Sequence, residues 1–206
     1  MRDWRWYWYK KISLYLSRYR QYDYSSRSHP LLEGLLVLVA DAAGNPVAGV
    51  NVTASVVPLS YTEGYYEWNE KAERWVQVTT SPYYCQNEDT DCDGILDDLG
   101  EDANGDNILG EDVNSNDMLT PGDVAVVTPT TTTDASGFGT LSLIYPEQYA
   151  SWVRVKLEDR ASVAGSEAVA VATFVLPGLN SDYADKKLSP PGDPSPFEIS
   201  NTCYLE

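Results

Sequence analysis

Short runs of β-forming residues, separated by turn signals, fill this chain from residue 31 to residue 178. The runs LLVLVAD (35–41) and VNVTASVVP (50–58) flank the turn-rich AAGNPVAG, and 65–68 and 74–78 are spaced as a hairpin. Further candidate strands lie at 124–133, 139–145, 151–159 and 167–177. None of this range keeps the 3.6-residue apolar period of a capped helix. The pattern predicts an all-β fold, an antiparallel β-sandwich.

Two of these segments resemble bacterial Ig-like domains of the invasin and intimin type. The first is LVLVADAAGNPVAGVNVTASV, in which a strand ends in Asp41 before a Gly-Asn-Pro turn. The second is TTDASGFGTLSLIY, with Thr133, Asp134 and Gly137 in a turn that enters a late strand. The resemblance covers roughly 35–58 and 128–176, and the long span 61–123 has no counterpart in it. It implies an Ig-like sandwich at the cell surface and does not imply an activity.

An acidic insertion, residues 86–123, interrupts the predicted sandwich. Between Glu88 and Asp123 lie 13 of the chain's 31 acids and no Lys, Arg or His. Three copies of the pattern D-x-[DN]-x-[DN]-[GND]-x-L begin at Asp89, Asp102 and Asp112. Because oxygen ligands at positions 1, 3 and 5 converge on one cation only if the chain turns sharply at position 6, this position requires a residue that tolerates positive φ. Gly94, Asn107 and Asp117 occupy the sixth positions.

Oxygen-rich loops of this shape suit a hard cation, and Ca²⁺ is the usual occupant. The copies start 13 and 10 residues apart, so acids at the end of one loop are expected to serve the next. Such shared acidic loops resemble thrombospondin type 3 repeats, and we expect two or three Ca²⁺ ions. The alternative is a solvated acidic linker without metal. The predicted ligands are Asp89, Asp91, Asp93, Asp97, Glu101, Asp102, Asn104, Asp106, Asp112, Asn114, Asn116 and Asp123.

Three cysteines make an odd count, which fits one disulfide and one remaining thiol. Cys92 lies between ligand positions 3 and 5, Cys85 precedes the loops, and Cys203 is near the C-terminus. We therefore predict a Cys85–Cys203 disulfide. A Cys85–Cys92 bridge would close a very short loop across a calcium ligand, and three free thiols are the remaining alternative, disfavoured in an oxidising compartment.

The basic N-terminal arm, residues 1–30, has a net charge of +5, whereas the rest of the chain has −22. Its apolar residues alternate with a period of two, which favours an extended strand over a helix. We expect this strand to bury its apolar side along a neighbouring copy of the chain by strand addition. The alternative is a strand that belongs to the arm's own sandwich. The predicted assembly residues are Trp4, Trp6, Trp8, Ile12, Leu14 and Leu16.

Composition excludes several classes of function. A net charge of −17 argues against nucleic acid as a partner, and no apolar run is long enough for a membrane helix. His29 is the single histidine and lies in a polar segment, so we find no catalytic set and do not expect an enzyme. No secretory signal is evident, so export is expected to be specified outside this sequence.

We therefore expect a structural subunit of a bacterial extracellular filament, stabilised by calcium and polymerising through its arm. The Pro-rich tail, residues 179–206, is expected to aid assembly. The alternative is a monomeric cell-surface adhesion or binding module that contacts a host or surface ligand through its calcium loops.

Overall fold

A computed structural model describes residues 11–16, 30–80, 84–92, 94–96, 110–112, 117–163, 166–199 and 203, with the backbone alone at 11–16 and 166. The regular structure of these residues consists of antiparallel β-strands and two short 3-10 turns, which confirms the all-β prediction. The part of the chain that the model describes contains no helix long and apolar enough to cross a membrane.

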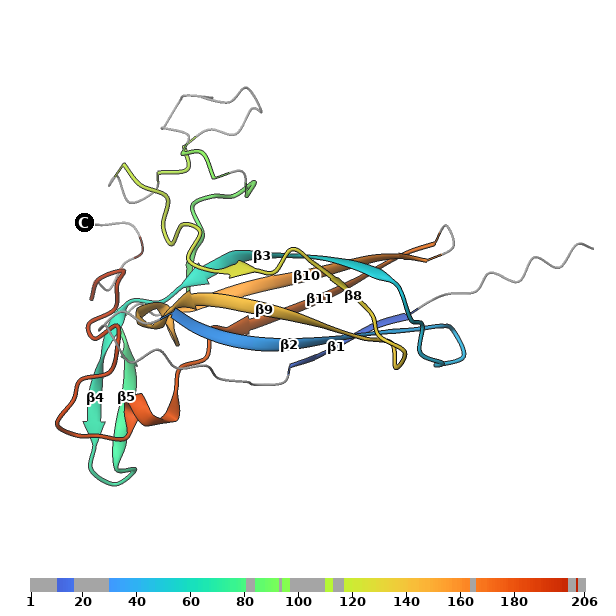
Figure 1. The fold of residues 1–206 in the computed structure, drawn as a ribbon. Coiled ribbons are helices and arrows are strands. Elements are labelled where there is room, and N and C mark those ends of the chain that lie inside the picture. Colours follow the sequence, from blue (N-terminus) through green and yellow to red (C-terminus); the bar gives the residue numbers. More distant parts are fainter. Residues whose placement is uncertain are drawn as a thin grey trace, which may run out of the picture.

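Two sheets pack face to face, and a separate hairpin extends from one end (Figure 1). The first sheet has the order β1 (Lys11–Leu16), β2 (Pro30–Ala40), β9 (Phe138–Pro146), β7 (Val126–Val127). The second has the order β11 (Ser166–Val175), β10 (Val153–Val163), β3 (Asn51–Tyr61), β6 (Cys85–Gln86), and β8 (Thr130–Thr132) also pairs with β3. The hairpin joins β4 (Gly64–Asn69) to β5 (Arg74–Thr79), and the 3-10 turns are η1 (Glu147–Tyr149) and η2 (Asn180–Tyr183).

The core lies between the sheets and is built by strict alternation. Along β2 every second side chain is buried, including Leu35 and Val37, and β10 repeats this pattern with Val155 and Leu157. Side chains of both sheets share one hydrophobic cluster around the fully buried Trp152. A period of two along both facing strands is the signature of a two-layer sandwich.

The predicted run 124–133 is divided between the two sheets. Its first part, β7, pairs with β9, whereas its second part, β8, pairs with β3. Pro129 lies at the break, where it has no N–H to donate and its carbonyl accepts a bond from Ala54 N at 2.9 Å. The chain therefore crosses from one sheet to the other at this proline.

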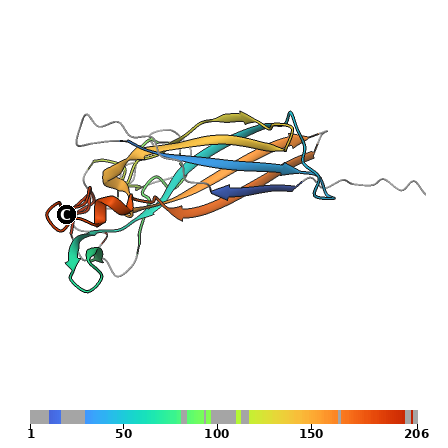
Figure 2. The ribbon, with the colours of Figure 1, turned by 60° about the horizontal axis from the view of Figure 1, so that its bottom comes forward.

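The N-terminal arm contributes an edge strand to its own sandwich. Strand β1 pairs with β2 in the register that sets Ile12, Leu14 and Leu16 opposite the buried Val39, Val37 and Leu35. It also lies alongside β11 of the other sheet, so it closes one seam of the sandwich (Figure 2).

Residues 11–16 thus take the cis alternative that the sequence analysis left open, and their pairing with a neighbouring copy stays a prediction. The physical reason for the cis pairing is that β2 would otherwise leave the edge beside its core residues uncovered. Trp4, Trp6 and Trp8 lie outside the described residues.

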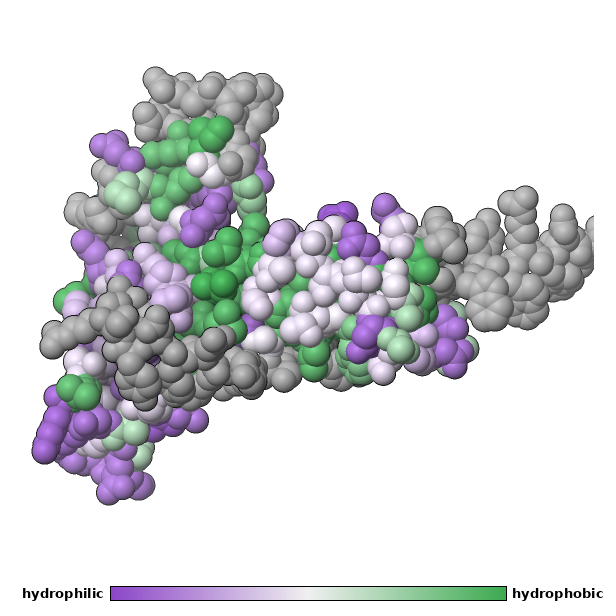
Figure 3. Space-filling view, viewed as in Figure 1, coloured by the Kyte–Doolittle hydropathy of each residue, from purple (hydrophilic) through white to green (hydrophobic). Residues whose placement is uncertain are grey.

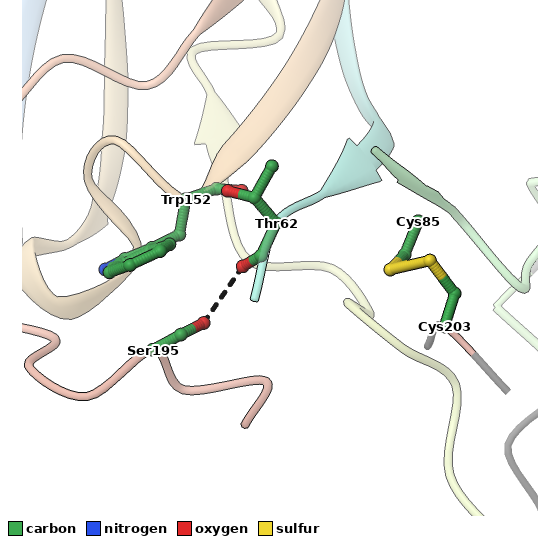
Figure 4. Close-up of a disulfide and its surroundings, with 5 residues drawn as sticks. All are labelled: Thr62, Cys85, Trp152, Ser195 and Cys203. Carbon is green, nitrogen blue, oxygen red and sulfur yellow. Dashed lines mark hydrogen bonds between the residues drawn. A yellow bond between two sulfur atoms is a disulfide. The ribbon is translucent and has the colours of Figure 1, made fainter. Parts of the chain in front are cut away.

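The Pro-rich tail packs onto the end of the sandwich. The Trp152 indole N–H donates to the Gly192 carbonyl at 2.8 Å, and Tyr66 N donates to Asp193 Oδ1 at 3.0 Å. Ser195 Oγ donates to the buried Thr62 carbonyl at 3.0 Å (Figure 4). These bonds integrate the tail into its own chain.

A Cys85–Cys203 disulfide also links the end of the tail to β6 (Figure 4). The predicted pairing is confirmed. Cys92 is free and exposed. Because Cys85 lies in β6 at the start of the acidic insertion, the insertion and the tail leave the sandwich at the same end (Figure 1).

Candidate metal centre

A bulge in β3 supports the first residues of the insertion. The pairing of β3 with β10 skips Leu59, because Val155 is opposite Pro58 and Arg154 is opposite Ser60. The freed Leu59 carbonyl accepts a bond from Asn87 N at 3.1 Å, and the Pro58 carbonyl accepts one from Asn87 Nδ2 at 3.0 Å. A proline in a strand interior removes one ladder bond, which allows a bulge at this point. The bulge therefore holds the start of the insertion against the sheet.

The sixth positions of the first and third copies have the predicted turn. Gly94 has φ +78° and Asp117 has φ +59°. In each case the amide of the sixth residue donates to the carboxylate at position 1, from Gly94 to Asp89 Oδ2 at 3.3 Å and from Asp117 to Asp112 Oδ2 at 3.1 Å. In both copies the sixth residue therefore has the predicted positive φ and is bonded back to the carboxylate at position 1. Asn107, at the sixth position of the second copy, lies outside the described residues.

Three carboxylates from two copies meet beside the sheet. Asp89, Asp91 and Glu111 each place an oxygen within 4.8 Å of the other two. Asp89 is 8% exposed and Glu111 is 2% exposed, whereas Asp91 is open to solvent. This cluster could hold a metal ion, with one ligand oxygen from each residue.

Glu111 is oriented by the first copy of the repeat. Its Oε1 accepts bonds from Thr90 N at 2.8 Å and from Thr90 Oγ1 at 2.9 Å. Its Oε2 is buried and has no hydrogen-bond partner among the residues that the structure describes. A buried carboxylate oxygen without a partner is costly unless a cation or a donor completes it. This oxygen therefore marks the position at which a cation would be bound.

The predicted ligands divide into three groups. Asp89 and Asp91 are in the cluster. The described Asp112 and Asp123 are outside it, and Asp123 is exposed. The remaining predicted ligands lie outside the described residues: Asp93, Asp97, Glu101, Asp102, Asn104, Asp106, Asn114 and Asn116.

Glu111 is a cluster residue that the sequence analysis omitted. The pattern was aligned on its first aspartate, and the glutamate before that aspartate was predicted as a ligand in the second copy (Glu101) but not in the third. The signal is present in the tripeptide Gly-Glu-Asp, which opens both the second copy (100–102) and the third (110–112). A repeat that recurs with its preceding glutamate indicates that the glutamate has a role.

The electrostatic setting of the cluster is acidic. The segment 88–123 contains no base, and the sandwich brings Lys156 of β10 close to Cys92. Burial raises the pKa of the Cys92 thiol, Asp89 raises it further, and Lys156 lowers it. Three clustered carboxylates in a segment without a base carry an excess of negative charge, which a divalent cation would neutralise.

Comparisons with known proteins give little further information. No family model matches the chain, and no curated protein matches it. Among solved structures, the chain is similar to the GAE domain of GGA2p from Saccharomyces cerevisiae, at 12% identity and a TM-score of 0.24. That alignment covers 82% of this chain and 90% of the other. Because the TM-score is so low, it supports no argument about fold or function.

Proposed function

We propose that this chain is an extracellular bacterial β-sandwich module that is stabilised by Ca²⁺ and acts as a monomeric adhesion or binding module. The observation that carries the proposal is the buried, unpartnered Oε2 of Glu111 beside Asp89 and Asp91. Carboxylate oxygens in a loop with a sharp sixth position are the ligands that Ca²⁺ prefers. Asp89, Asp91 and Glu111 would hold the ion, and it would join the first and third copies of the repeat.

An extracellular location is supported by two features that act together. A structural disulfide persists in oxidising compartments, and extracellular Ca²⁺ sites bind at roughly 10⁻⁴ to 10⁻³ M. At tenfold excess of free ion, each site would add about 1.4 kcal/mol to the free energy of unfolding. The ion thus has a structural role, and we assign the module no catalytic activity.

A monomer is favoured over the filament that the sequence analysis preferred. Residues 11–16 complete the edge of their own sheet, and the tail is bonded to its own sandwich. Both segments that were expected to join neighbours are thus engaged in cis. The whole chain should sediment as a monomer in Ca²⁺. Deleting residues 1–10 should leave it folded, whereas deleting residues 1–16 should destabilise it by uncovering β2.

The metal assignment is tested by thermal unfolding of the whole chain in excess Ca²⁺ and in excess chelator. Wild type should melt at a higher temperature in Ca²⁺, and Glu111→Gln should lose most of that increase. The matched control is Glu167→Gln, which changes an exposed glutamate on β11 and should keep the full increase.

The measurement in chelator shows whether Glu111 binds the metal or only accepts hydrogen bonds from Thr90. If Glu111 is a metal ligand, the neutral amide relieves repulsion with Asp89, so Glu111→Gln should be at least as stable as wild type without Ca²⁺. An equal loss of stability in both conditions would mean that Glu111 only accepts the Thr90 bonds. If chelation leaves the melting temperature of the wild type unchanged, the proposal is wrong.

A further inference from the structure

A second candidate site lies at the same end of the sandwich, beside the hairpin β4–β5. It is a cavity of about 230 Å³ between the hairpin, the turn before Trp152 and η2. Figure 3 shows hydrophilic residues over the visible surface at this lower end of the molecule. The side chains that matter to its chemistry are those of Tyr66, Arg74, Trp75, Gln77, Ser151 and Tyr183.

Three hydroxyl-bearing residues line this cavity. Ser151 Oγ and the Tyr183 hydroxyl lie 3.2 Å apart. Tyr66 is 5% exposed, and its buried hydroxyl lies near Tyr183 and Ser151 but makes no hydrogen bond of standard geometry with any described residue. Burial raises the pKa of Tyr66, and the neighbouring Tyr183 raises it further. The Tyr66 hydroxyl is therefore a poorly compensated polar group just behind the Ser151 and Tyr183 hydroxyls of the pocket.

Ser151 is held in a backbone conformation that non-glycine residues rarely adopt. Its φ is +66°, and two bonds fix it there: its N–H donates to the Leu176 carbonyl at 2.7 Å, and its carbonyl accepts from Gln77 Nε2 at 3.1 Å. Positive φ at a serine costs free energy, and such strain concentrates at binding sites. Ser151 lines the cavity in this conformation.

Aromatic rings and one cation complete the lining. The Trp75 indole N–H already donates to the Asp185 carbonyl at 2.9 Å, and its ring packs against Trp68 with the centroids 5.8 Å apart, so the rest of this half-buried ring is the part left for a ligand. The Tyr66 and Tyr183 rings pack 5.4 Å apart beside it. Arg74 is exposed and forms no ion pair with any residue that the model describes. A guanidinium that lines the same pocket as the Trp75 ring suits a ligand with both a carboxylate and an apolar ring face.

We propose that this cavity binds a single saccharide unit that carries a carboxylate, such as a uronic or sialic acid. The half-buried Trp75 ring would contact the C–H face of the sugar, and the hydroxyls of Ser151 and Tyr183 would bond its hydroxyl groups, with the buried Tyr66 behind them. Arg74 would pair with the carboxylate. The proposal rests on the binding role proposed above and names its ligand, but the cavity shares no residue with the metal cluster.

The test is a chemical-shift titration of the whole, Ca²⁺-loaded chain with three free sugars: D-glucuronate, N-acetylneuraminate and D-glucose. At least one acidic sugar should shift the Trp75 indole signal and bind at least tenfold more tightly than glucose. The two acidic probes separate a uronic from a sialic ligand. Arg74→Gln should abolish the preference for the acidic sugar. Arg160→Gln, at an exposed arginine paired with Glu158, should not.

Trp75→Leu should remove binding altogether, and Arg74→Gln remains informative if that variant does not fold. Equal binding of the acidic sugars and glucose would overturn the role of Arg74. No shift with any sugar would overturn the saccharide site. If the melting temperature still responds to Ca²⁺ in that case, the metal proposal survives, so the two failures are distinguishable.

Discussion

Glu88 and Thr120 bond to each other across the two ends of the acidic insertion. Thr120 N donates to Glu88 Oε2 at 2.8 Å, and Glu88 N donates to the Thr120 carbonyl at 3.0 Å. Glu88 is 3% exposed, so its carboxylate is committed to this closure. Because Asn87 is bonded to the bulge in β3, the closed base of the loops is part of the sandwich. A cation bound above this base would stabilise the whole domain.

Replacing Glu88 by Ala should open this base. The lost bond joins a buried carboxylate to an amide, so we expect the free energy of unfolding to fall by about 1–3 kcal/mol. Denaturant unfolding measures the change, and limited proteolysis should show faster cleavage within 88–120. Glu167→Ala, at an exposed glutamate on β11, is the control. Equal cleavage rates in the two variants would show that Glu88 does not close the insertion.

Removing the disulfide should destabilise the domain more than any single hydrogen bond. Cys85 and Cys203 are 118 residues apart, and a loop of this length corresponds to about 3–5 kcal/mol by chain entropy. We expect Cys203→Ser to lose roughly this amount in denaturant unfolding. Cys92→Ser should change stability by no more than about 0.5 kcal/mol, since Cys92 is exposed and free. Non-reduced peptide mapping that recovers Cys85 bridged to Cys92 would contradict the assignment.

Asp159 is the most unfavourably placed charge in the core. It is fully buried on β10 between Leu157 and Ala161, and neither carboxylate oxygen has a hydrogen-bond partner in the described part of the chain. Burial raises its pKa from 3.8 to about 6. Because the folded-state pKa is the higher one, its contribution to stability is fully present below about pH 4 and is lost as the pH rises through about 6. Glu147 has the same kind of effect on the pH dependence of stability, since burial and the nearby Asp182 raise its pKa to about 7.

Asp159→Asn should therefore stabilise the protein at neutral and alkaline pH. We expect a gain of about 1–3 kcal/mol at pH 8 that shrinks toward zero below pH 4. The measurement is the free energy of unfolding of both proteins from pH 4 to 8 in excess chelator, so that metal binding does not contribute. Lower stability of the variant at every pH would mean that the carboxylate has a partner in solution.

Local chemistry made several features of this fold predictable from sequence. The turn at the sixth loop position depends on residue type, because only Gly, Asn or Asp adopts positive φ at low cost, and Gly94 and Asp117 do so. Alternating apolar residues likewise predict β9 and β10 to within a few residues, because one face of each must be buried.

The remaining features depend on contacts between distant segments. Glu111 joins Asp89 and Asp91 across 20 residues, and no pattern within one loop copy specifies that approach. The alternation around Ile12 predicts a strand but does not identify its partner. The partner is β2 of the same chain, whose edge remains uncovered once β9 occupies its other side.

Two turn glycines provide a matched test of the end of the sandwich opposite the insertion. Gly44 and Gly137 follow Asp41 and Asp134, whose carboxylates accept the turn amides, and their φ values are +85° and +77°. A Cβ at position 44 would meet nothing within 4 Å, whereas at position 137 it would lie 2.7 Å from the Val39 carbonyl oxygen. Gly44→Ala should therefore cost about 1–2 kcal/mol, from backbone conformation alone.

Gly137→Ala has the same cost in backbone conformation, and its Cβ would also clash with the Val39 carbonyl oxygen and with the Pro46 ring. It should cost about 1–3 kcal/mol more than Gly44→Ala. Denaturant unfolding of the two variants under one condition gives the difference directly, because the backbone cost is common to both. The bond from Val39 N to the Gly137 carbonyl, at 2.9 Å, should exchange its amide proton faster in Gly137→Ala. Equal destabilisation by the two substitutions would show that the close approach of this turn to β2 is absent in solution.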